Sequence, residues 1–386
     1  MQHLSEKKMT NRSRTEAIML QFAEESGLTN PGKSPKRYLW TDAFAVCNFL
    51  GLYLETEEAR YKELALALVA QVHRVLGCYA ENDPREGRIS GLSEEEGRKH
   101  PTAGGLRIGK PLPERGKEMP YDAQTEWDRD GQYFHYLTKW MHALSRVTQV
   151  TGDPVYNRWA IELAQSVHAK FTYFDESIHR KRLVWKMSVD LSRTLVPSMG
   201  QHDALDAWIV YSELQAVART AASDGPWPDL HTQIEEAGKI SELNSMLTDD
   251  PLGLGGLLSD VCLCLQVRPE AKELVHRILQ SATEGMRLYG EGENRLDYPA
   301  EYRLAFRELG LAIGLKALES AAPLVAEEPL FRSVRRYDVL AGEIIRFWTE
   351  KAHQQNSVWL EHKEINSVML ATALSPEGYH ALKTGE

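Results

Sequence analysis

The stretch EWDRDGQYFHYLTKWM, residues 126–141, gives the clearest indication of the fold. It begins as a polar, acidic segment, and from Gly131 onward aromatic and apolar residues recur at helical spacing. An acid at a helix start caps the helix and interacts favourably with its dipole, so capping accounts for one acid. Two acids, a tryptophan and a histidine are more than capping requires. The stretch therefore predicts an amphipathic helix whose N-terminus borders a functional pocket.

The composition bounds the class of protein. The chain has 386 residues, of which 42% are hydrophobic and 26% charged, with a net charge of −10. Such a chain is long enough for a large globular core, and its negative charge argues against nucleic acid or an anionic membrane as the main partner. Residues 1–14 lack the apolar core of a secretory signal, and no apolar run has the length of a membrane span.

The cysteines point to a compartment. They lack companion metal ligands at the usual spacings, so we expect buried free thiols in a reducing cytoplasm. The residues concerned are Cys47, Cys78, Cys262 and Cys264.

Helical periodicity extends over nearly the whole chain and comes in pairs separated by Gly, Pro and Asp breaks. Residues 182–195 instead alternate weakly and predict a short strand or hairpin. The predicted helices span 14–25, 40–54, 57–76, 131–150, 153–171, 203–222, 230–246, 252–266, 270–289, 301–319, 331–352 and 363–374.

Pairing the last predicted helix with the first completes six helical hairpins. Six hairpins closed into a ring describe an all-α (α/α)6 toroid, a single domain over residues 1–386 with a small β excursion near 182–195. A helical solenoid is the competing architecture, but its repeats are shorter, more regular and similar in sequence.

The segment 78–126 is long, rich in Gly, Pro and charge, and weakly periodic, as functional loops often are. Its centre, GGLRIGKPLPER at 104–115, is no phosphate-binding loop, because no strand precedes it and no Gly-Lys-Ser/Thr follows. We expect a possible lid that carries Arg107, Lys110 and Arg115 over the barrel mouth. The alternative is that these cations pair on the surface with Glu94, Glu95, Glu96 and Glu114.

If the first helix of each hairpin is the inner one, the six inner N-termini share one mouth. The fourth contributes a glycine-rich start, 253–256, where a backbone could approach a ligand. Each acid alone is most simply a cap and each aromatic a core residue, so the functional interpretation depends on their joint placement. The side chains expected at the mouth are Trp40, Asp42, Trp127, Asp128, Asp130, Tyr133, His135, Gln201, His202, Asp203, Asp206, Asp250, Tyr298, Glu301, Tyr302, Arg303, Trp359, Glu361, His362 and Glu364.

Such a set suits a sugar, because rings stack on its apolar faces while carboxylates and amides bind its hydroxyls. From about residue 14 to 374 the chain resembles the six-hairpin glycosidase-like group of (α/α)6 proteins, and the helix start WDRDGQ at 127–132 is similar to the aromatic and acidic starts in those enzymes. The group includes inverting glycoside hydrolases, unsaturated-uronyl hydrolases and, in a related toroid, N-acylglucosamine 2-epimerases. The resemblance implies carbohydrate chemistry, although a shared fold does not give a shared reaction.

Three functions remain open at this point. A glycoside hydrolase needs two carboxyl groups, supplied by Asp128 or Asp130 with Asp203 or Asp206. A sugar epimerase or isomerase would use imidazoles as acid and base, with acidic partners among Glu301, Glu361 and Glu364. A toroid that binds a sugar or peptide without catalysis is the third. The imidazole candidates are His135, His202 and His362.

No metal or other cofactor is expected. The acids near His202 and His362 match no zinc spacing such as His-Glu-x-x-His. We expect a small-molecule or oligosaccharide substrate. The residues expected to bind it are Trp40, Asp42, Arg107, Lys110, Arg115, Trp127, Tyr133, Gln201, Glu301, Arg303, Glu361, His362 and Glu364.

Overall fold

The computed structural model describes residues 10–30, 32–220, 227–242, 245–291, 295–325 and 328–381. Among these residues, no helix combines the length and apolar character needed to cross a membrane. The α-helices are α1 (Asn11–Glu25), α2 (Leu39–Thr56), α3 (Ala59–Val75), α4 (Glu94–Lys99), α5 (Ala123–Asp128), α6 (Phe134–Thr151), α7 (Val155–Phe171), α8 (Asp203–Thr220), α9 (His231–Ser241), α10 (Pro251–Val267), α11 (Lys272–Glu291), α12 (Ala305–Ser320), α13 (Ala322–Val325), α14 (Pro329–Arg335), α15 (Asp338–Thr349), α16 (Ser357–Glu361), α17 (Lys363–Leu374) and α18 (Glu377–His380).

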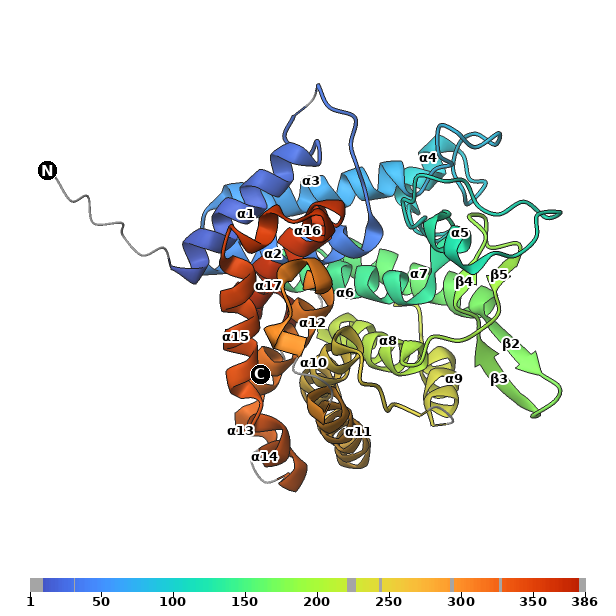
Figure 1. Ribbon diagram of the computed structural model, residues 1–386. Helices are drawn as coiled ribbons and strands as arrows, with labels where there is room; N and C mark the ends of the chain where they lie inside the picture. Colours follow the sequence, from blue (N-terminus) through green and yellow to red (C-terminus); the bar gives the residue numbers. More distant parts are fainter. Residues whose placement is uncertain are drawn as a thin grey trace, which may run out of the picture.

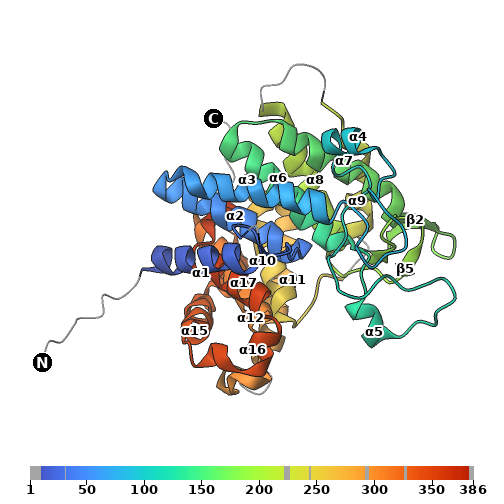
Figure 2. The same cartoon turned by 90° about the horizontal axis from the view of Figure 1, so that it is seen from above.

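The helices form two concentric layers (Figure 1). Six of them, α2, α6, α8, α10, α12 and α17, make a closed inner ring in which each contacts the next and α17 returns to α2. Outside them pack α3, α7, α9, α11, α15 and α1, each against its partner in the inner ring. Thirteen of the 18 residues of α2 are buried but only six of the 17 in α3, as expected for an inner and an outer helix. The predicted (α/α)6 toroid is confirmed, including the pairing of α1 with α17, which lie side by side in Figure 2.

Some predicted boundaries are wrong. The helix predicted over 331–352 is two helices, α14 and α15, because Tyr337 adopts φ −94° and ψ 4° and ends the first helical ladder. The helix predicted from residue 301 begins with a single 3-10 turn, Ala300–Tyr302, and α12 starts only at Ala305 after an extended Leu304. Residues 221–222 and 243–244, also predicted as helical, lie outside the described residues.

The β excursion is confirmed and is larger than predicted. Strands β3 (Arg180–Leu183), β4 (Lys186–Met187) and β5 (Thr194–Val196) lie in or near the predicted segment. Strand β2 (Thr172–Asp175) pairs with β3 in a hairpin at the edge of the helical body (Figure 1). Strand β1 (Gln132–Tyr133), predicted as the first turn of a helix, pairs with β4 instead. This small sheet therefore fixes the start of α6.

The segment 78–126 packs into the body of the structure and does not lie across its surface. Leu106 and Ile108 are fully buried in the core. The backbone N–H of Ile108 donates to the carbonyl of Gly131, and that of Leu39 donates to the carbonyl of Ile108. The segment thus connects the start of α2 to the start of α6, and its ends carry the short helices α4 and α5.

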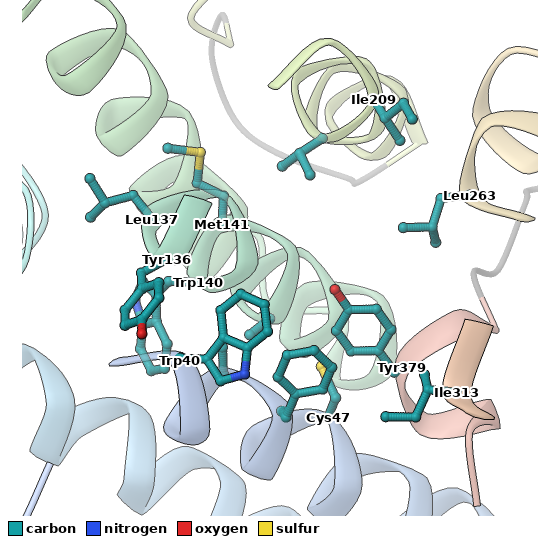
Figure 3. Packing of buried hydrophobic residues seen from close by; sticks show 14 of the residues in the cluster. Trp40, Cys47, Tyr136, Leu137, Trp140, Met141, Ile209, Leu263, Ile313 and Tyr379 are labelled. Atoms are coloured by element: carbon teal, nitrogen blue, oxygen red, sulfur yellow. The ribbon is translucent and has the colours of Figure 1, made fainter. Parts of the chain in front are cut away.

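Buried side chains from all the inner helices fill the barrel interior, and Figure 3 shows some of those from α2, α6, α8, α10 and α12. At the end where the inner helices finish, the C-terminal residues close the barrel. The ring of Tyr379 stacks on Phe44 with centroids 4.6 Å apart, and Nε2 of His142 donates to the carbonyl of Tyr379 at 2.9 Å. The open end is therefore the one at which the inner helices begin.

Gly255 of α10 allows two helices to pack closely, a role that we had not predicted for the glycine-rich start of α10. A Cβ atom on Gly255 would collide with the carbonyl of Gly310, and one on Gly314 would collide with the backbone of Gly255. The backbones of α10 and α12 approach closely only because these positions lack side chains. Gly256, next along α10, has no heavy atom within 4 Å of the position of its missing Cβ.

Replacing Gly255 by alanine should therefore destabilise the protein, whereas the same change at Gly256 should not. We expect Gly255→Ala to lower the free energy of unfolding by about 2 kcal/mol through overpacking. Gly256→Ala should leave it unchanged or raise it by up to about 1 kcal/mol, since alanine favours the helix. Urea unfolding of the two variants measures both values. Equal effects would show that the α10–α12 crossing does not depend on the missing side chain.

Candidate active site

A cavity of about 1070 Å³ occupies the open end of the barrel. Its wall is formed by the first residues of α2, α6, α10, α12 and α17, and by the segment 107–111. Five of the six inner helices therefore begin at one mouth as we expected, whereas α8 contributes no residue to the lining of the cavity. Eight of the predicted site residues line the cavity: Trp40, Arg107, Lys110, Trp127, His135, Glu361, His362 and Glu364.

Aromatic rings form one wall of the cavity. The ring of Trp40 packs against both His135 and Tyr136, with centroid distances of 5.9 and 5.3 Å. Trp127 stands at the rim with 44% of its surface exposed. Tyr133, predicted to bind substrate, is instead buried behind His135, with ring centroids 5.5 Å apart. The ring of Tyr133 stacks on the imidazole, and Tyr133 does not line the cavity.

His135 reaches the cavity because strand β1 ends immediately before α6 and places this residue in the first helical turn. Behind it lies Asp203, the first residue of α8, with Oδ1 3.9 Å from Nδ1 of His135. Within the described residues, neither Nδ1 of His135 nor Oδ2 of Asp203 has a hydrogen-bond partner. The cavity wall therefore has an imidazole in front and a carboxyl group behind it.

Burial sets the protonation states of this pair. It lowers the pKa of His135 to about 4, and it raises the pKa of Asp203 to about 8, with a further increase from the charge of Asp206. At neutral pH the imidazole is therefore neutral and the carboxyl group protonated. A proton acceptor therefore lines the cavity, and a proton donor lies 3.9 Å behind it, outside the cavity lining. General acid–base chemistry uses such a pair of groups.

Two buried charged residues below this pair were not predicted. Lys139 follows His135 by four positions and so lies on the same face of α6; its Nζ is 3.0 Å from Oδ2 of Asp206. Asp260 is the single acid in the otherwise apolar helix α10 and is 2% exposed. The i, i+4 spacing and the lone acid in an apolar run were the signals in the sequence.

Asp130 is an anchor for the segment 78–126 and does not face the cavity. Its Oδ2 accepts a hydrogen bond from Nη1 of Arg107 at 2.5 Å, and its Oδ1 accepts from the backbone N–H of Gly109 at 3.0 Å. Arg107 also donates to the carbonyls of Cys78 and Val75. Both charges are buried, so Arg107 borders the cavity with its guanidinium already occupied.

Arg115 is occupied in a similar way. Its Nε lies 2.7 Å from a carboxylate oxygen of Glu126, and one of its Nη groups donates to the carbonyl of Leu195. The surface pairing that we considered as an alternative is wrong, because those four glutamates bind other cations, namely Arg88, Lys99 and Arg85.

Lys110 is the remaining cation of the predicted lid. Its Nζ lies over the rings of Trp127 and Tyr38, 5.3 and 5.6 Å from their centroids. In the part of the chain that the structure describes, no carboxylate lies within ion-pair distance of this ammonium. Asp128, exposed at the end of α5, acts on it electrostatically from the rim. Of the three cations, Lys110 alone keeps its charge free for a ligand.

Several predicted binding residues have structural partners. Asp42 is buried beside Arg37, 3.3 Å away, and accepts from the backbone N–H of Tyr38. Burial raises the pKa of Asp42 to about 6 although Arg37 opposes the shift. Arg303 forms a buried ion pair with Glu308 at 2.6 Å. Asp42 and Arg303 are therefore absent from the cavity lining, whereas Arg37 and Tyr38 belong to it.

Three more candidates lie away from the cavity. Gln201 donates to backbone carbonyls of the segment 245–247, and Nε2 of His202 donates to the carbonyl of Met246 at 3.0 Å. Glu301 is exposed on its 3-10 turn and does not line the cavity. The structure therefore gathers His135 and His362 at the mouth but not His202. In the described chain no three His, Cys, Asp or Glu side chains are arranged to hold a metal ion.

Asp130 and Asp128 differ in role although they are two positions apart. Asp130→Asn should lower the free energy of unfolding by about 3 kcal/mol, because it leaves the buried Arg107 without its counter-ion. Asp128→Asn, at an exposed position, should change it by less than about 0.5 kcal/mol. Urea unfolding of both variants measures the difference. A loss no larger for Asp130 than for Asp128 would contradict the anchoring role.

The chain matches no protein-family model and no curated protein. Solved structures do match over nearly its whole length. They include a GH76 alpha-mannanase from Bacteroides thetaiotaomicron (TM-score 0.58, 6% identity, 96% of this chain and 97% of that chain). They also include a D-mannose isomerase (0.53, 10%, 95% and 97%) and a cellobiose 2-epimerase from Bacillus thermoamylovorans B4167 (0.52, 10%, 94% and 97%). At these identities the likeness concerns the fold alone, and the fold of this chain is the (α/α)6 toroid that these proteins share.

Proposed function

We propose that this chain is a carbohydrate-active enzyme that binds its substrate in the mouth cavity. The volume of about 1070 Å³ is at the upper end for ligand sites and is large enough for more than one sugar ring. Its wall combines aromatic faces with imidazoles and carboxylates, the groups that bind and process sugars. The structural neighbours named above, a mannanase, an isomerase and an epimerase, support the proposal through their fold. A reducing compartment such as the cytoplasm is part of it, because all four cysteines are free thiols.

Glycoside hydrolysis is the reaction that we place first. The observation that carries it is Asp203, a carboxyl group that is protonated at neutral pH and lies 3.9 Å from the cavity-lining His135. A carboxylic acid with a raised pKa is the proton donor that cleavage of a glycosidic bond requires. The second carboxyl group is Glu361 or Glu364 in the cavity lining, or Asp128 at the rim. Asp130, one of the predicted acids, is committed to Arg107 and is left out.

Epimerisation or isomerisation is the second candidate, favoured by one observation. His135 from α6 and His362 at the start of α17 both line the cavity. A neutral imidazole such as His135 can remove a proton next to a carbonyl group, and a second imidazole can return one. Non-catalytic binding is the third, and the shifted pKa values of His135 and Asp203 speak against it.

Lys110 leads us to propose a substrate that carries a carboxylate or a phosphate. Its ammonium lies above an exposed aromatic ring at the rim, where a sugar could stack on Trp127 while its anionic group meets the charge. Burial lowers the pKa of Lys110, and a bound anion would offset that cost. The chain has a net charge of −10, so an extra positive charge is not needed to keep it soluble. An unpaired cation at the mouth is therefore better explained as a group that binds an anion.

A panel of neutral sugars, uronic acids and sugar phosphates should contain a ligand that raises the melting temperature. A ligand at 100 times its dissociation constant adds about 2.7 kcal/mol to the free energy of unfolding. Turnover of that ligand in deuterated water separates the two reactions: hydrolysis releases a new reducing end, whereas epimerisation or isomerisation adds deuterium at a sugar carbon. His135→Gln should lower the turnover by about 100-fold or more in either case.

His202→Gln provides the comparison, because His202 is an imidazole near the same mouth that does not line the cavity. It should retain most of the turnover. Equal losses in the two histidine variants would show that the cavity wall around His135 is not the reacting site. No stabilisation by any sugar in the panel would contradict the proposed function.

Lys110→Met should weaken the binding of an acidic sugar and spare its neutral counterpart. A charge-assisted contact at a partly exposed site contributes about 1.5–3 kcal/mol, so we expect a loss of about 10-fold or more in affinity for the uronic acid. Lys117→Met, an exposed lysine of the same segment outside the cavity lining, is the matched control. An equal loss of affinity for the neutral sugar would assign Lys110 to general packing.

A further inference from the structure

A buried charge cluster lies in the barrel interior below His135, and of its four members the proposed reaction uses only Asp203. It consists of Lys139 from α6, Asp206 from α8 and Asp260 from α10, with Asp203 above them. Asp203, Asp206 and Asp260 are 5%, 7% and 2% exposed. Nζ of Lys139 lies 3.0 Å from Oδ2 of Asp206. The cluster therefore joins three neighbouring inner helices immediately behind the cavity wall.

The cluster contains more carboxyl groups than cations. Among the described residues, Lys139 provides the positive charge that acts on both Asp203 and Asp260. The other titratable groups facing the cluster are uncharged in this setting: His135 and His202, whose pKa values burial lowers, and Tyr379 of α18, whose pKa burial raises. An ionised carboxylate in such an interior is strongly unfavourable without a counter-ion. One carboxyl group can be ionised against Lys139, and the other two keep their protons.

The contacts show which group is ionised. Asp206 touches Lys139, and its negative charge raises the pKa of Lys139 although burial alone would lower it. Oδ2 of Asp203 and Oδ2 of Asp260 have no hydrogen-bond partner in the described structure. Burial, followed by the charge of Asp206, raises the pKa of both groups. The ionised group is therefore Asp206, and the two protons are on Asp203 and Asp260.

We infer that the Lys139–Asp206 ion pair is a positioning element that keeps Asp203 protonated behind His135. Asp206 lies three residues after Asp203, so the two carboxyl groups share one face of α8. The negative charge of Asp206 therefore disfavours ionisation of Asp203. Lys139, with its Nζ 3.0 Å from Oδ2, is the counter-ion that the buried Asp206 requires. The catalytic use of this proton rests on the proposed function, but the assignment of protons does not.

Carbon-13 NMR of protein labelled at the aspartate carboxyl carbon tests the assignment without a substrate. The Asp203 signal is identified by its loss in Asp203→Asn. In the unaltered protein it should titrate near pH 8, as expected for a pKa of about 8. In Asp206→Asn the like charge is gone and Lys139 needs a new counter-ion, so the midpoint should fall by more than about one pH unit.

Asp260→Asn is the matched control. An amide has the shape of a protonated carboxyl group and, like it, can donate a hydrogen bond. This variant should move the Asp203 midpoint by less than about half a pH unit. An Asp203 midpoint near pH 4 in the unaltered protein would overturn the inference. So would an unchanged midpoint in Asp206→Asn, or an equal fall in Asp260→Asn.

The pH dependence of stability gives a second readout that does not need Asp206→Asn to fold. Between about pH 4 and pH 8 the folded state holds a proton on Asp203 that the unfolded chain has released. Its contribution to stability is therefore lost as the pH rises through that window. The urea midpoint of Asp203→Asn should rise relative to the unaltered protein from pH 4 to pH 8. A difference independent of pH would overturn the inference.

Both readouts are distinct from the test of the proposed function. The sugar panel can fail while the cluster titrates as described, and the cluster can fail while a sugar binds. On a substrate found in the panel, the alkaline limb of the kcat profile should move to lower pH in Asp206→Asn together with the Asp203 midpoint. A purely structural role for Asp206 would lower kcat without moving the limb, and would overturn the positioning role.

Discussion

The buried ion pair between Arg107 and Asp130 determines how the mouth of the barrel is built. Isolated buried ion pairs contribute little net stability, because desolvation of both charges offsets their attraction. Here the pair collects further hydrogen bonds from the backbone N–H groups of Gly109 and Lys110 and gives others to the carbonyls of Cys78 and Val75. Those bonds fix one path for the segment 78–126. The position of Lys110 at the rim, and of β1 ahead of α6, follows from that path.

The acids of this chain show how environment, and not residue type, decides their chemistry. Asp130 meets a guanidinium and two backbone donors, and it serves as an anchor. Asp203 is also buried but meets another carboxylate and no cation of its own, so it keeps a proton at neutral pH. Both precede or begin an inner helix, where the dipole favours a negative charge by about 0.3–1 kcal/mol. Burial of Asp203 outweighs that effect, since its pKa is raised and not lowered.

The sequence was sufficient for the architecture and for part of the site. Helical periodicity located the inner helices, and the placement of Trp40, His135 and His362 at helix starts brought them to one mouth, because the inner helices run in parallel. The sequence could not separate Asp130 from Asp203, since both are acids beside an aromatic or imidazole side chain near a helix start. It also did not reveal the packing role of Gly255, because spacing defines the face of a helix that a residue occupies but not what packs on it.

The same limit explains why Lys139 and Asp260 were missed. Each lies on a predicted helix at a position where a core residue is expected. Their role depends on a third helix, α8, which brings Asp206 between them. A closed ring of six inner helices encloses a space that excludes water. An ionisable side chain that points into this space must therefore pair with a residue on another helix or stay neutral. Because only one lysine faces three carboxyl groups in the described part of this chain, two of these groups keep their protons. Asp203, one of these groups, lies directly behind the cavity-lining His135, so in the reaction that we propose the barrel interior takes part in the chemistry of the mouth.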